Sequence, residues 1–209
     1  MGSEMCIRDR FKGNWQLKVE AKSSVREVKI GKQIWMTENL NVDRFRNGDL
    51  IPEARTNEEW VKAGKVGKPA WCYYNNDPEN GKKYGKLYNW YAVNDPRGLA
   101  PKDYHIPSDA EWALLTGYLG GENVAGGKMK TTSGWSESGN GNNSSGFSGL
   151  PGGLRHLDGM FDYICEYGIW WSSTEFFTLT ALSHGFNFAA YSADQAKRKV
   201  AISVRCLRD

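Results

Sequence analysis

The segment Ser108–Leu119 constrains the fold of this chain most, because it carries the most complete set of helix signals. Pro107 precedes it, Ser108 can cap its first turn, and Glu111 completes a capping box. Apolar side chains then recur at helical spacing before a pair of glycines, namely Trp112, Leu115, Tyr118 and Leu119. We therefore expect a short amphipathic helix whose apolar stripe packs on a sheet or on another helix.

A second helix pattern spans Thr56–Ala63. The Thr56 side chain can accept a hydrogen bond from the backbone N–H three residues on, and Glu59 can reach back to close a second capping box. Gly64 is a suitable stop. We expect a short helix here as well.

Short alternating runs predict strands at both ends of the chain. Val28–Leu40 has the pattern of a hairpin with its turn at Gly31-Lys32. Three more runs follow in the last third: Ile169–Thr174, Ser183–Ala190 and Lys199–Leu207. In the final run we expect one face to carry Val200, Ile202, Val204 and Cys206, and the other to carry Lys199, Ser203 and Arg205. Two short helices with small β elements indicate a single α+β domain.

The stretch from Gly120 to Gly153 has little regular pattern, and Ser133–Gly149 consists almost entirely of turn-forming residues. A long loop inside a compact domain is usually functional or disordered. Trp135, Phe147 and Leu150 could hold this one to the core, so we expect an ordered long loop.

Composition limits the classes of partner. The chain has 209 residues, of which 40% are hydrophobic and 24% charged, which is typical of a globular domain. Its one basic cluster, Lys197-Arg198-Lys199, lacks the interleaved aromatic residues of a nucleic-acid site, so we expect no nucleic-acid partner. No apolar run approaches the ~20 residues of a transmembrane helix.

The first 27 residues do not look like part of the domain. Met1–Arg10 has no apolar region and joins abruptly to Phe11-Lys12-Gly13, like an artefactual leader in translated environmental sequence. The polar residues 11–27 are weakly patterned. We therefore expect residues 1–27 to be a disordered leader or linker, the domain to span residues 28–209, and the true N-terminus to be missing.

Six ordered motifs carry a family resemblance: Ile30–Leu40, Tyr84–Trp90, His105–Trp112, Gly146–Gly153, Trp170–Glu175 and Ser203–Cys206. From Val28 to Asp209 the chain resembles the Fibrobacter succinogenes major paralogous domain. The resemblance implies a C-type-lectin-like fold with two short helices, a small twisted antiparallel sheet that pairs the first and last strands, and a long loop region. It also implies an exported bacterial protein, extracellular or on the cell surface, often behind a lipoprotein signal.

The family's biochemical role is undefined, so function is an expectation. We expect a non-catalytic recognition module that binds a glycan or a surface protein through the 120–153 loop and the face that carries Trp170 and Trp171. The alternative is a structural or accessory domain of a larger surface assembly, with no small ligand.

The resemblance also bears on the cysteines. Many members have a cysteine near the position of Ala100-Pro101, and that partner for Cys206 is missing here. Cys72 is then the candidate partner in a Cys72–Cys206 disulfide, which leaves Cys165 as a small buried thiol. Cys6 lies in the leader.

Aromatic side chains supply the candidate ligand-binding residues, Trp135, Trp170 and Trp171, since flat rings can stack on sugars. Trp170 and Trp171 are adjacent on a strand and must face opposite sides. One is then buried, and the other lies in a second layer or is exposed. The alternative is core packing for all three.

A polar turn supplies the candidate metal site. Asn75, Asp77, Glu79 and Asn80 offer several hard oxygen atoms, which suit Ca²⁺. The spacing matches neither an EF-hand loop nor the order used by sugar-binding C-type lectins. The alternative is an ordinary polar turn stabilised by its own side chains.

Catalytic patterns are absent from the sequence. His105, His156 and His184 share no ligand spacing, and the serines do not lie in a nucleophile-elbow motif. Carboxylates such as Glu111 could pair only across space. A formylglycine-generating oxidase needs two adjacent thiolates for copper(I), whereas Cys165 and Cys206 lie far apart in sequence. We expect no enzyme activity, and no cofactor apart from a possible Ca²⁺.

Overall fold

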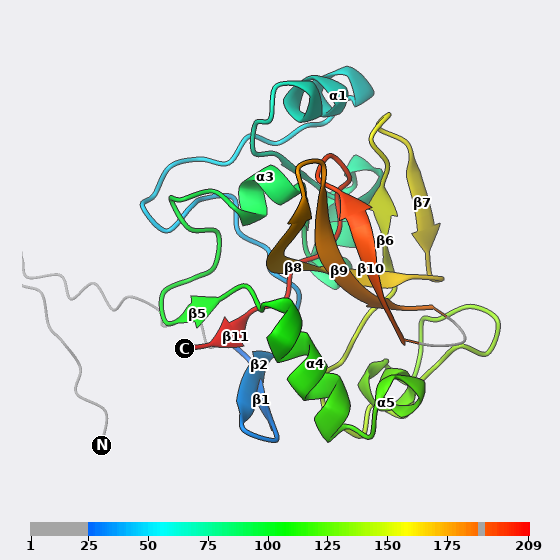
Figure 1. Cartoon of the computed structure of the whole chain (residues 1–209). Coiled ribbons are helices and arrows are strands. Elements are labelled where there is room, and N and C mark those ends of the chain that lie inside the picture. The colour runs from blue at the N-terminus through cyan, green and yellow to red at the C-terminus, as the bar shows by residue number, and fades with distance from the viewer. Residues whose placement is uncertain (1–24, 188–190) are drawn as a thin grey trace, which may run out of the picture.

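The computed structural model describes residues 25–187 and 191–209. Of the expected leader, residues 1–24, including Cys6, lie outside the described residues, and Glu27 already belongs to the first strand. The described part is an α+β fold with a four-stranded sheet, a three-stranded sheet and two two-stranded sheets, all antiparallel. In Figure 1, α4 and α5 lie at one end of the three-stranded sheet and α1 lies at the opposite end of the molecule.

The four-stranded sheet joins both ends of the described chain. It contains β1 (Glu27–Ile30), β2 (Gln33–Met36), β11 (Leu207–Arg208) and β5 (Tyr104–His105), in the order β1-β2-β11-β5. The predicted hairpin is confirmed, with Ile30 opposite Gln33 and Gly31 in the left-handed region at φ +61°. Leu207 pairs with both Trp35 and His105, so the first hairpin and the last strand are neighbours.

The three-stranded sheet contains β8 (Gly168–Phe177), β9 (Thr180–Phe186) and β10 (Tyr191–Lys197), in the order β10-β9-β8. The predicted strand Ile169–Thr174 lies within β8. Ser183–Ala190 is a strand up to Phe186, and residues 188–190 lie outside the described residues. Two short pairs complete the β structure: β3 (Trp71–Cys72) with β4 (Leu87–Tyr88), and β6 (Gly152–Arg155) with β7 (Phe161–Ile164).

The predicted strand Lys199–Leu207 is largely wrong. Only Leu207 belongs to a strand, and residues 201–203 form single bridges to Arg155, Tyr88 and Trp170. The predicted polar face is also wrong, because Ser203 and Arg205 are as buried as Ile202 and Val204. Residues 201–206 are all buried and are held by single bridges to three different segments, so their polar side chains face no solvent. Lys199 is partly exposed, as predicted for the polar face.

Both predicted helices are confirmed, with their capping boxes. Thr56 and Glu59 cap α1 (Asn57–Lys65), and Ser108 and Glu111 cap α4 (Asp109–Tyr118). α1 continues past Gly64. In α4, Trp112, Leu115 and Leu119 are buried as expected, whereas Tyr118 is 68% exposed.

The expectation of only two helices is wrong. The structure adds α2 (Pro78–Tyr84), α3 (Trp90–Val93) and α5 (Glu122–Met129), with a 3₁₀ turn at Tyr74–Asn76 before α2. α5 has two adjacent glycines, which lower its intrinsic helix propensity. It forms because one face is buried against the core at Ala125, Gly126 and Met129.

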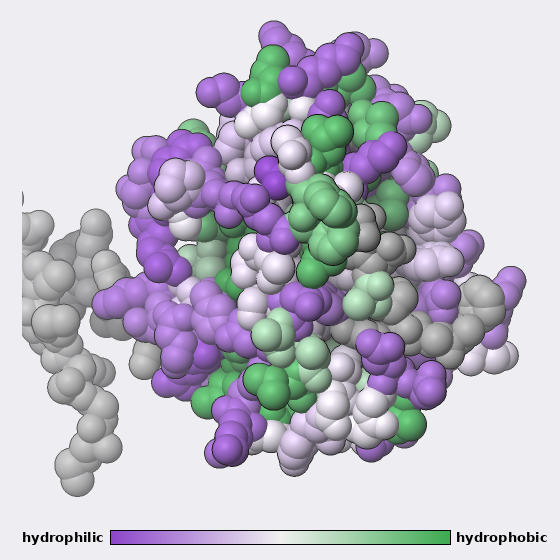
Figure 2. All heavy atoms as spheres, viewed as in Figure 1, coloured by the Kyte–Doolittle hydropathy of each residue, from purple (hydrophilic) through white to green (hydrophobic). Residues whose placement is uncertain are grey.

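Aromatic rings fill the core beneath α4. Trp35 packs 4.8 Å from Trp112 between ring centres, and Phe147 packs 5.7 Å from Trp170. Of the three side chains expected to hold the long loop, Phe147 and Trp135 are buried and Leu150 is half-buried. The expectation that the whole stretch is loop is wrong, because α5 lies within it. Figure 2 shows hydrophilic atoms over much of this face with hydrophobic patches among them. Exposed apolar side chains include Phe177 and Leu179, which flank the turn between β8 and β9.

Candidate ligand-binding cleft

A polar cleft of about 290 Å³ opens where segments far apart in the sequence meet. The residues just after β2 form one wall, with Thr37, Glu38, Asn39 and Asn41. The C-terminal half of α2 and Gly85 form a second wall. The long loop closes the cleft with Thr131, Ser148 and Leu150, and Arg26 lies at the rim. Three of the six family motifs therefore line one cleft.

Asn39 forms the rigid floor. Its Oδ1 accepts hydrogen bonds from Trp170 Nε1 at 2.8 Å and from Arg205 Nη2 at 2.7 Å. Its Nδ2 donates to the carbonyl oxygen of Tyr84 at 2.8 Å and lies 3.3 Å from Ser203 Oγ. The side chain is almost fully buried, so this network fixes its orientation. The partners of Asn39 come from three further stretches of chain, which explains why motifs so far apart occur together.

Arg205 is a fully buried cation beneath this floor. Besides Asn39, its Nη1 donates to the carbonyl oxygens of Met36 at 3.0 Å and Phe147 at 2.6 Å. Its guanidinium also lies 4.5 Å from the centre of the Phe147 ring. These partners are all uncharged. Burial lowers the pKa of Arg205 to about 9, because the charged form loses hydration.

Lys86 is a second buried cation behind the cleft. Its Nζ donates to Asn41 Oδ1 at 2.9 Å and lies 3.2 Å from the Asn41 carbonyl oxygen. The ammonium also lies 4.3 Å from the centre of the Trp71 ring, a cation–π contact. Asn41 Nδ2 donates in turn to the carbonyl oxygen of Gly81 at 3.3 Å. Asn39 thus connects the buried Arg205 to the surface of the cleft, and Asn41 connects the buried Lys86 to it.

The rim carries exposed charges. Arg26 and Glu38 approach to 3.7 Å, and both side chains are largely exposed. Lys82 pairs with Glu79 at 2.6 Å, and Lys83 lies over the Tyr84 ring at 4.7 Å. Exposed pairs of this kind contribute little to stability, so the rim side chains can rearrange around a ligand.

Backbone geometry also shapes the cleft. Gly85 has φ +75°, and a Cβ at this position would lie 2.9 Å from the carbonyl oxygen of Leu40. Only glycine fits there without displacing the wall. On the loop side, Asn143 holds Ser148 through two hydrogen bonds, from Nδ2 to Ser148 Oγ at 3.0 Å and from the Ser148 amide to Oδ1 at 2.9 Å.

The predicted aromatic binding surface does not form from Trp135, Trp170 and Trp171. All three rings are buried, and Trp170 and Trp171 have no exposed area. They do face opposite sides of β8, but both sides are covered. Trp170 packs among the aromatic rings beneath α4, whereas Trp171 lies in a second cluster and donates from Nε1 to the Tyr88 carbonyl at 2.7 Å. A buried ring cannot stack on a ligand.

The predicted calcium residues have other partners. Asp77 caps α2 by accepting from the Glu79 amide at 2.9 Å, and Asn80 donates to the Tyr74 carbonyl oxygen at 3.0 Å. Asn75 adopts a left-handed conformation at φ +54°. Together they stabilise the corner before α2, as the alternative of a self-stabilised polar turn implies. No group of three or more His, Cys, Asp or Glu residues that could hold a metal occurs within residues 25–187 and 191–209. The calcium site stays a prediction.

The predicted Cys72–Cys206 disulfide is wrong, because both residues are free thiols. Cys72 lies in β3 and packs with Leu87, whereas Cys206 precedes β11 and packs in a different core cluster. Burial raises the pKa of each thiol to about 12, so both remain protonated. Cys165 is also free, as expected, but the expectation that it is buried is wrong, because it is partly exposed.

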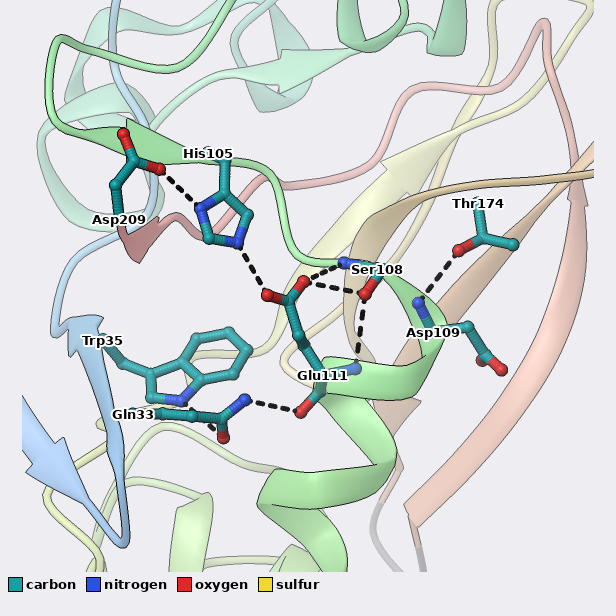
Figure 3. Close-up of polar contacts among 8 residues, drawn as sticks. All are labelled: Gln33, Trp35, His105, Ser108, Asp109, Glu111, Thr174 and Asp209. Atoms are coloured by element: carbon teal, nitrogen blue, oxygen red, sulfur yellow. Dashed lines mark hydrogen bonds and ion pairs between the residues drawn. The ribbon is translucent and has the colours of Figure 1, made fainter.

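A second polar cluster lies where β5, α4 and the last residue meet (Figure 3). His105 Nε2 lies 2.9 Å from Glu111 Oε1, and its Nδ1 lies 2.7 Å from Asp209 Oδ1. The other oxygen of Glu111 accepts from the backbone N–H and from Oγ of Ser108, each at 2.7 Å. Sequence reasoning missed this cluster, since only the pairing of β5 with β11 brings Asp209 to His105.

This cluster has the geometry of a structural link rather than of a catalytic triad. Both ring nitrogens of His105 face carboxylates, so neither is available to accept a proton from Ser108. Ser108 Oγ donates to Glu111 as part of the capping box of α4. Burial lowers the pKa of His105, but its hydrogen bonds to Asp209 and Glu111 outweigh this and raise the pKa overall. The imidazole therefore connects β5, α4 and the residue that follows β11.

The other two histidines lie elsewhere. His184 is buried, stacks on Trp112 and lies 3.0 Å from Asp109 Oδ1. Burial lowers its pKa to about 4, and the carboxylate of Asp109 offsets only part of this effect. His156 lies 3.6 Å from Asp162 Oδ2. Each histidine thus has its own carboxylate neighbour, and the three form no common site.

Comparison with known proteins places these features in a family. Within the described residues, no helix is both long and apolar enough to cross a membrane. No curated protein and no solved structure matches the chain. The model of the Fibrobacter succinogenes major domain matches residues 28–208, which is nearly the whole chain. The chain therefore belongs to the Fibrobacter succinogenes major domain family.

Proposed function

We propose that this chain is a non-catalytic recognition module that binds a glycan in the polar cleft. The observation that carries the proposal is the convergence on Asn39. Hydrogen bonds link residues from five of the six motifs, namely Asn39, Tyr84, Phe147, Trp170 and Arg205. Asn39 lines the open cleft, and the other four lie buried around it. A structural core alone would not require these motifs to meet at a solvent-accessible hollow.

The chemistry of the cleft favours a hydroxyl-rich ligand. Asn41, Thr37 and Ser148 offer amide and hydroxyl groups that both donate and accept, as sugar hydroxyls do. The volume lies near the lower end of the ~300–1,000 Å³ range of ligand sites, which suits a small part of a saccharide chain. The hydrogen bonds of Asn39 pre-organise the floor, which lowers the entropic cost of binding.

A non-catalytic role is supported by the same residues. Among those that line the cleft, Glu38 is the one carboxylate, and it is exposed and lies beside Arg26. Glycoside hydrolysis commonly uses two carboxylates on either side of the bond that breaks. The protonated, separately buried thiols of Cys72 and Cys206 argue against a copper(I) oxidase of the formylglycine-generating type.

The proposal also includes a C-type-lectin-like fold and a location at the bacterial surface. The pairing of the first hairpin with the last strand and the long ordered loop support a C-type-lectin-like fold. We infer an exported domain at the bacterial surface, carried by a lipoprotein or a secreted protein, from its family. Binding measured with and without chelator tests the calcium requirement.

A second candidate function rests on one specific observation. The turn between β8 and β9 exposes Phe177 by 67% and Leu179 by 68%, and Phe176 lies beside them. Exposed apolar groups of this kind are frequent at contacts between proteins. They would suit a structural or accessory domain of a larger surface assembly.

Glycan-array binding of the full chain, with Ca²⁺ and again with chelator, tests the proposal. We expect selective binding that the variant Ser148→Ala weakens severalfold, because it removes a hydroxyl from the cleft wall. Ser173→Ala is the matched control, since Ser173 is exposed on β8 outside the cleft. Loss on chelation would implicate Asn75–Asn80 or a similar oxygen cluster. No binding to any glycan by folded protein would reject the glycan function and favour the assembly role.

A further inference from the structure

Two cations lie buried against the polar cleft without a carboxylate partner. Arg205 donates to Asn39, Met36 and Phe147, all through uncharged oxygens. Lys86 donates to the Asn41 side chain and backbone and lies over aromatic rings. Neither cation takes part in an ion pair with the described residues. The protein thus keeps two positive charges at low dielectric directly behind the cleft.

The rim adds more positive than negative charge. Arg26, Lys82 and Lys83 line the cleft, against Glu38 alone. Glu38 lies beside Arg26, and Glu79 pairs with Lys82 from outside the cleft. Lys83 forms no ion pair with a carboxylate of the described residues. Its ammonium lies over the Tyr84 ring instead. Glu38 also attracts the Arg205 guanidinium through space, so its charge cannot be assigned to Arg26 alone. With Glu79 assigned to Lys82, four cations face the single carboxylate of Glu38, namely Arg26, Lys83, Lys86 and Arg205.

Burial of an arginine does not by itself indicate a binding site. Arg155 is equally buried, and it donates to the carbonyl oxygens of Ala54, Thr56 and Gly159 near the start of α1. It lies away from the residues that line the cleft, and its role is to satisfy carbonyl groups. Arg205 and Lys86 differ because Asn39 and Asn41, which hold them, form the surface of an open hollow.

A cleft with low-dielectric walls and charge of one sign focuses the electric field toward its mouth. An anionic group placed there would gain from the net positive charge that remains after Glu38 is counted. A neutral ligand would gain only hydrogen bonds. The buried cations also cannot move away or become screened by salt as readily as exposed lysines can.

We propose that the cleft selects acidic saccharides, whose carboxylate or sulfate group lies near Asn41 and Lys83 and whose hydroxyl groups contact Thr37 and Ser148. This inference rests on the proposed glycan-binding function and names its ligand class. A carboxylate and a sulfate ester both present negatively charged oxygen atoms, which the cleft would recognise. The experiment must therefore distinguish a carboxylated saccharide from a sulfated one.

Calorimetric titration of the full chain with matched pairs of short saccharides tests the inference. One pair is an oligogalacturonide and its methyl ester, which differ in charge but not in the sugar. The other is a sulfated galactan oligomer and its unsulfated form. We expect the acidic member of at least one pair to bind roughly tenfold more tightly. That preference should shrink only in part as the salt concentration rises, because salt screens the exposed Lys83 and screens the buried Lys86 and Arg205 much less. The pair that shows the preference identifies carboxylate or sulfate as the recognised group.

Charge-altering variants locate the effect in the cleft. Lys83→Gln should weaken binding of the acidic member and leave its neutral counterpart unchanged. Lys102→Gln, a change at an exposed lysine outside the cleft, is the matched control. Glu38→Gln should strengthen binding of the acidic member, because it removes the one negative side chain of the lining.

The possible failures are distinguishable. If the protein binds saccharides but prefers neither member of either pair, the charge inference is overturned and the glycan-binding proposal stands. If folded protein binds no saccharide in this set or on the array, the glycan-binding proposal itself fails. An acidic preference that Lys83→Gln and Glu38→Gln leave unchanged would place recognition outside the cleft and also overturn the inference.

Discussion

Asn39 and Arg205 lie 166 residues apart and share one hydrogen-bonding centre, because Oδ1 of the amide accepts from Nε of Arg205 at 3.1 Å and from its Nη2 at 2.7 Å. The same oxygen also accepts from Trp170. One amide therefore fixes the segment after β2, strand β8 and the segment before β11. Stability and the floor of the cleft depend on the same few bonds.

The first prediction concerns Arg205→Met. Methionine keeps much of the side-chain volume but leaves the buried carbonyl oxygens of Met36 and Phe147 without this donor. We expect the free energy of unfolding to fall by about 2–4 kcal/mol, measured by denaturant titration. Arg44→Met, at an exposed position, should change it by less than about 0.5 kcal/mol. Equal stability of the two variants would contradict the role given to Arg205.

Local signals in the sequence were enough for the first hairpin and for α1 and α4. Each of these elements carries its own turn or capping residues, such as Gly31, Thr56 and Ser108, so neighbours in sequence determine it. α5 lacked such a signal, because two glycines hide its helical pattern and only burial against the core stabilises it.

The cleft could not be predicted for a different reason. Alternation of polar and apolar residues identifies a strand face only when one side meets water. Ser203 and Arg205 are buried although polar, since hydrogen bonds from distant segments satisfy them. The family motifs indicated which segments matter, but their meeting at Asn39 is a property of the three-dimensional fold.

The second prediction separates packing from binding at the tryptophans. Trp171→Ala should lower the free energy of unfolding by about 3–5 kcal/mol, because it empties a fully buried site and leaves the Tyr88 carbonyl without its indole donor. Denaturant titration measures this loss. Trp171→Phe should cost less. If Trp171→Ala kept its stability and lost glycan binding alone, the ring would be acting as a ligand contact after all.

The third prediction concerns the thiols. Intact mass should be the same with and without reductant, since Cys72 and Cys206 are free. In native conditions both should react with a thiol reagent far more slowly than the partly exposed Cys165, because burial excludes the reagent and raises each pKa to about 12. In denaturant the rates should converge. A mass that increases by two hydrogens on reduction would show that one disulfide is present and would contradict the prediction.

The last prediction is that His105 and His184 give stability opposite dependences on pH. The pKa of His105 is raised in the folded protein, so its contribution is full below the unfolded value near 6.5 and is lost as pH rises through the folded value. The pKa of His184 is lowered to about 4, so its contribution is lost as pH falls from 6.5 toward 4. Its loss amounts to roughly 3 kcal/mol at most. Glu111, whose pKa is lowered, adds a further loss below about 4.5.

Denaturant titrations between pH 4 and 9 check this prediction with one variant for each histidine. His184→Phe, which retains a ring against Trp112, should flatten the decline in stability below pH 6.5 and leave the alkaline limb unchanged. His105→Gln should flatten the decline above pH 6.5 and leave the decline between pH 6.5 and about 4.5 unchanged. Below about 4.5 it should also reduce the contribution of Glu111, because His105 helps to lower the pKa of that carboxyl. Each variant is the control for the other, because both remove one imidazole. If His105→Gln instead altered only the acid limb, its carboxylates would not hold the charged imidazole, and the link among β5, α4 and β11 would have to be explained by backbone pairing alone.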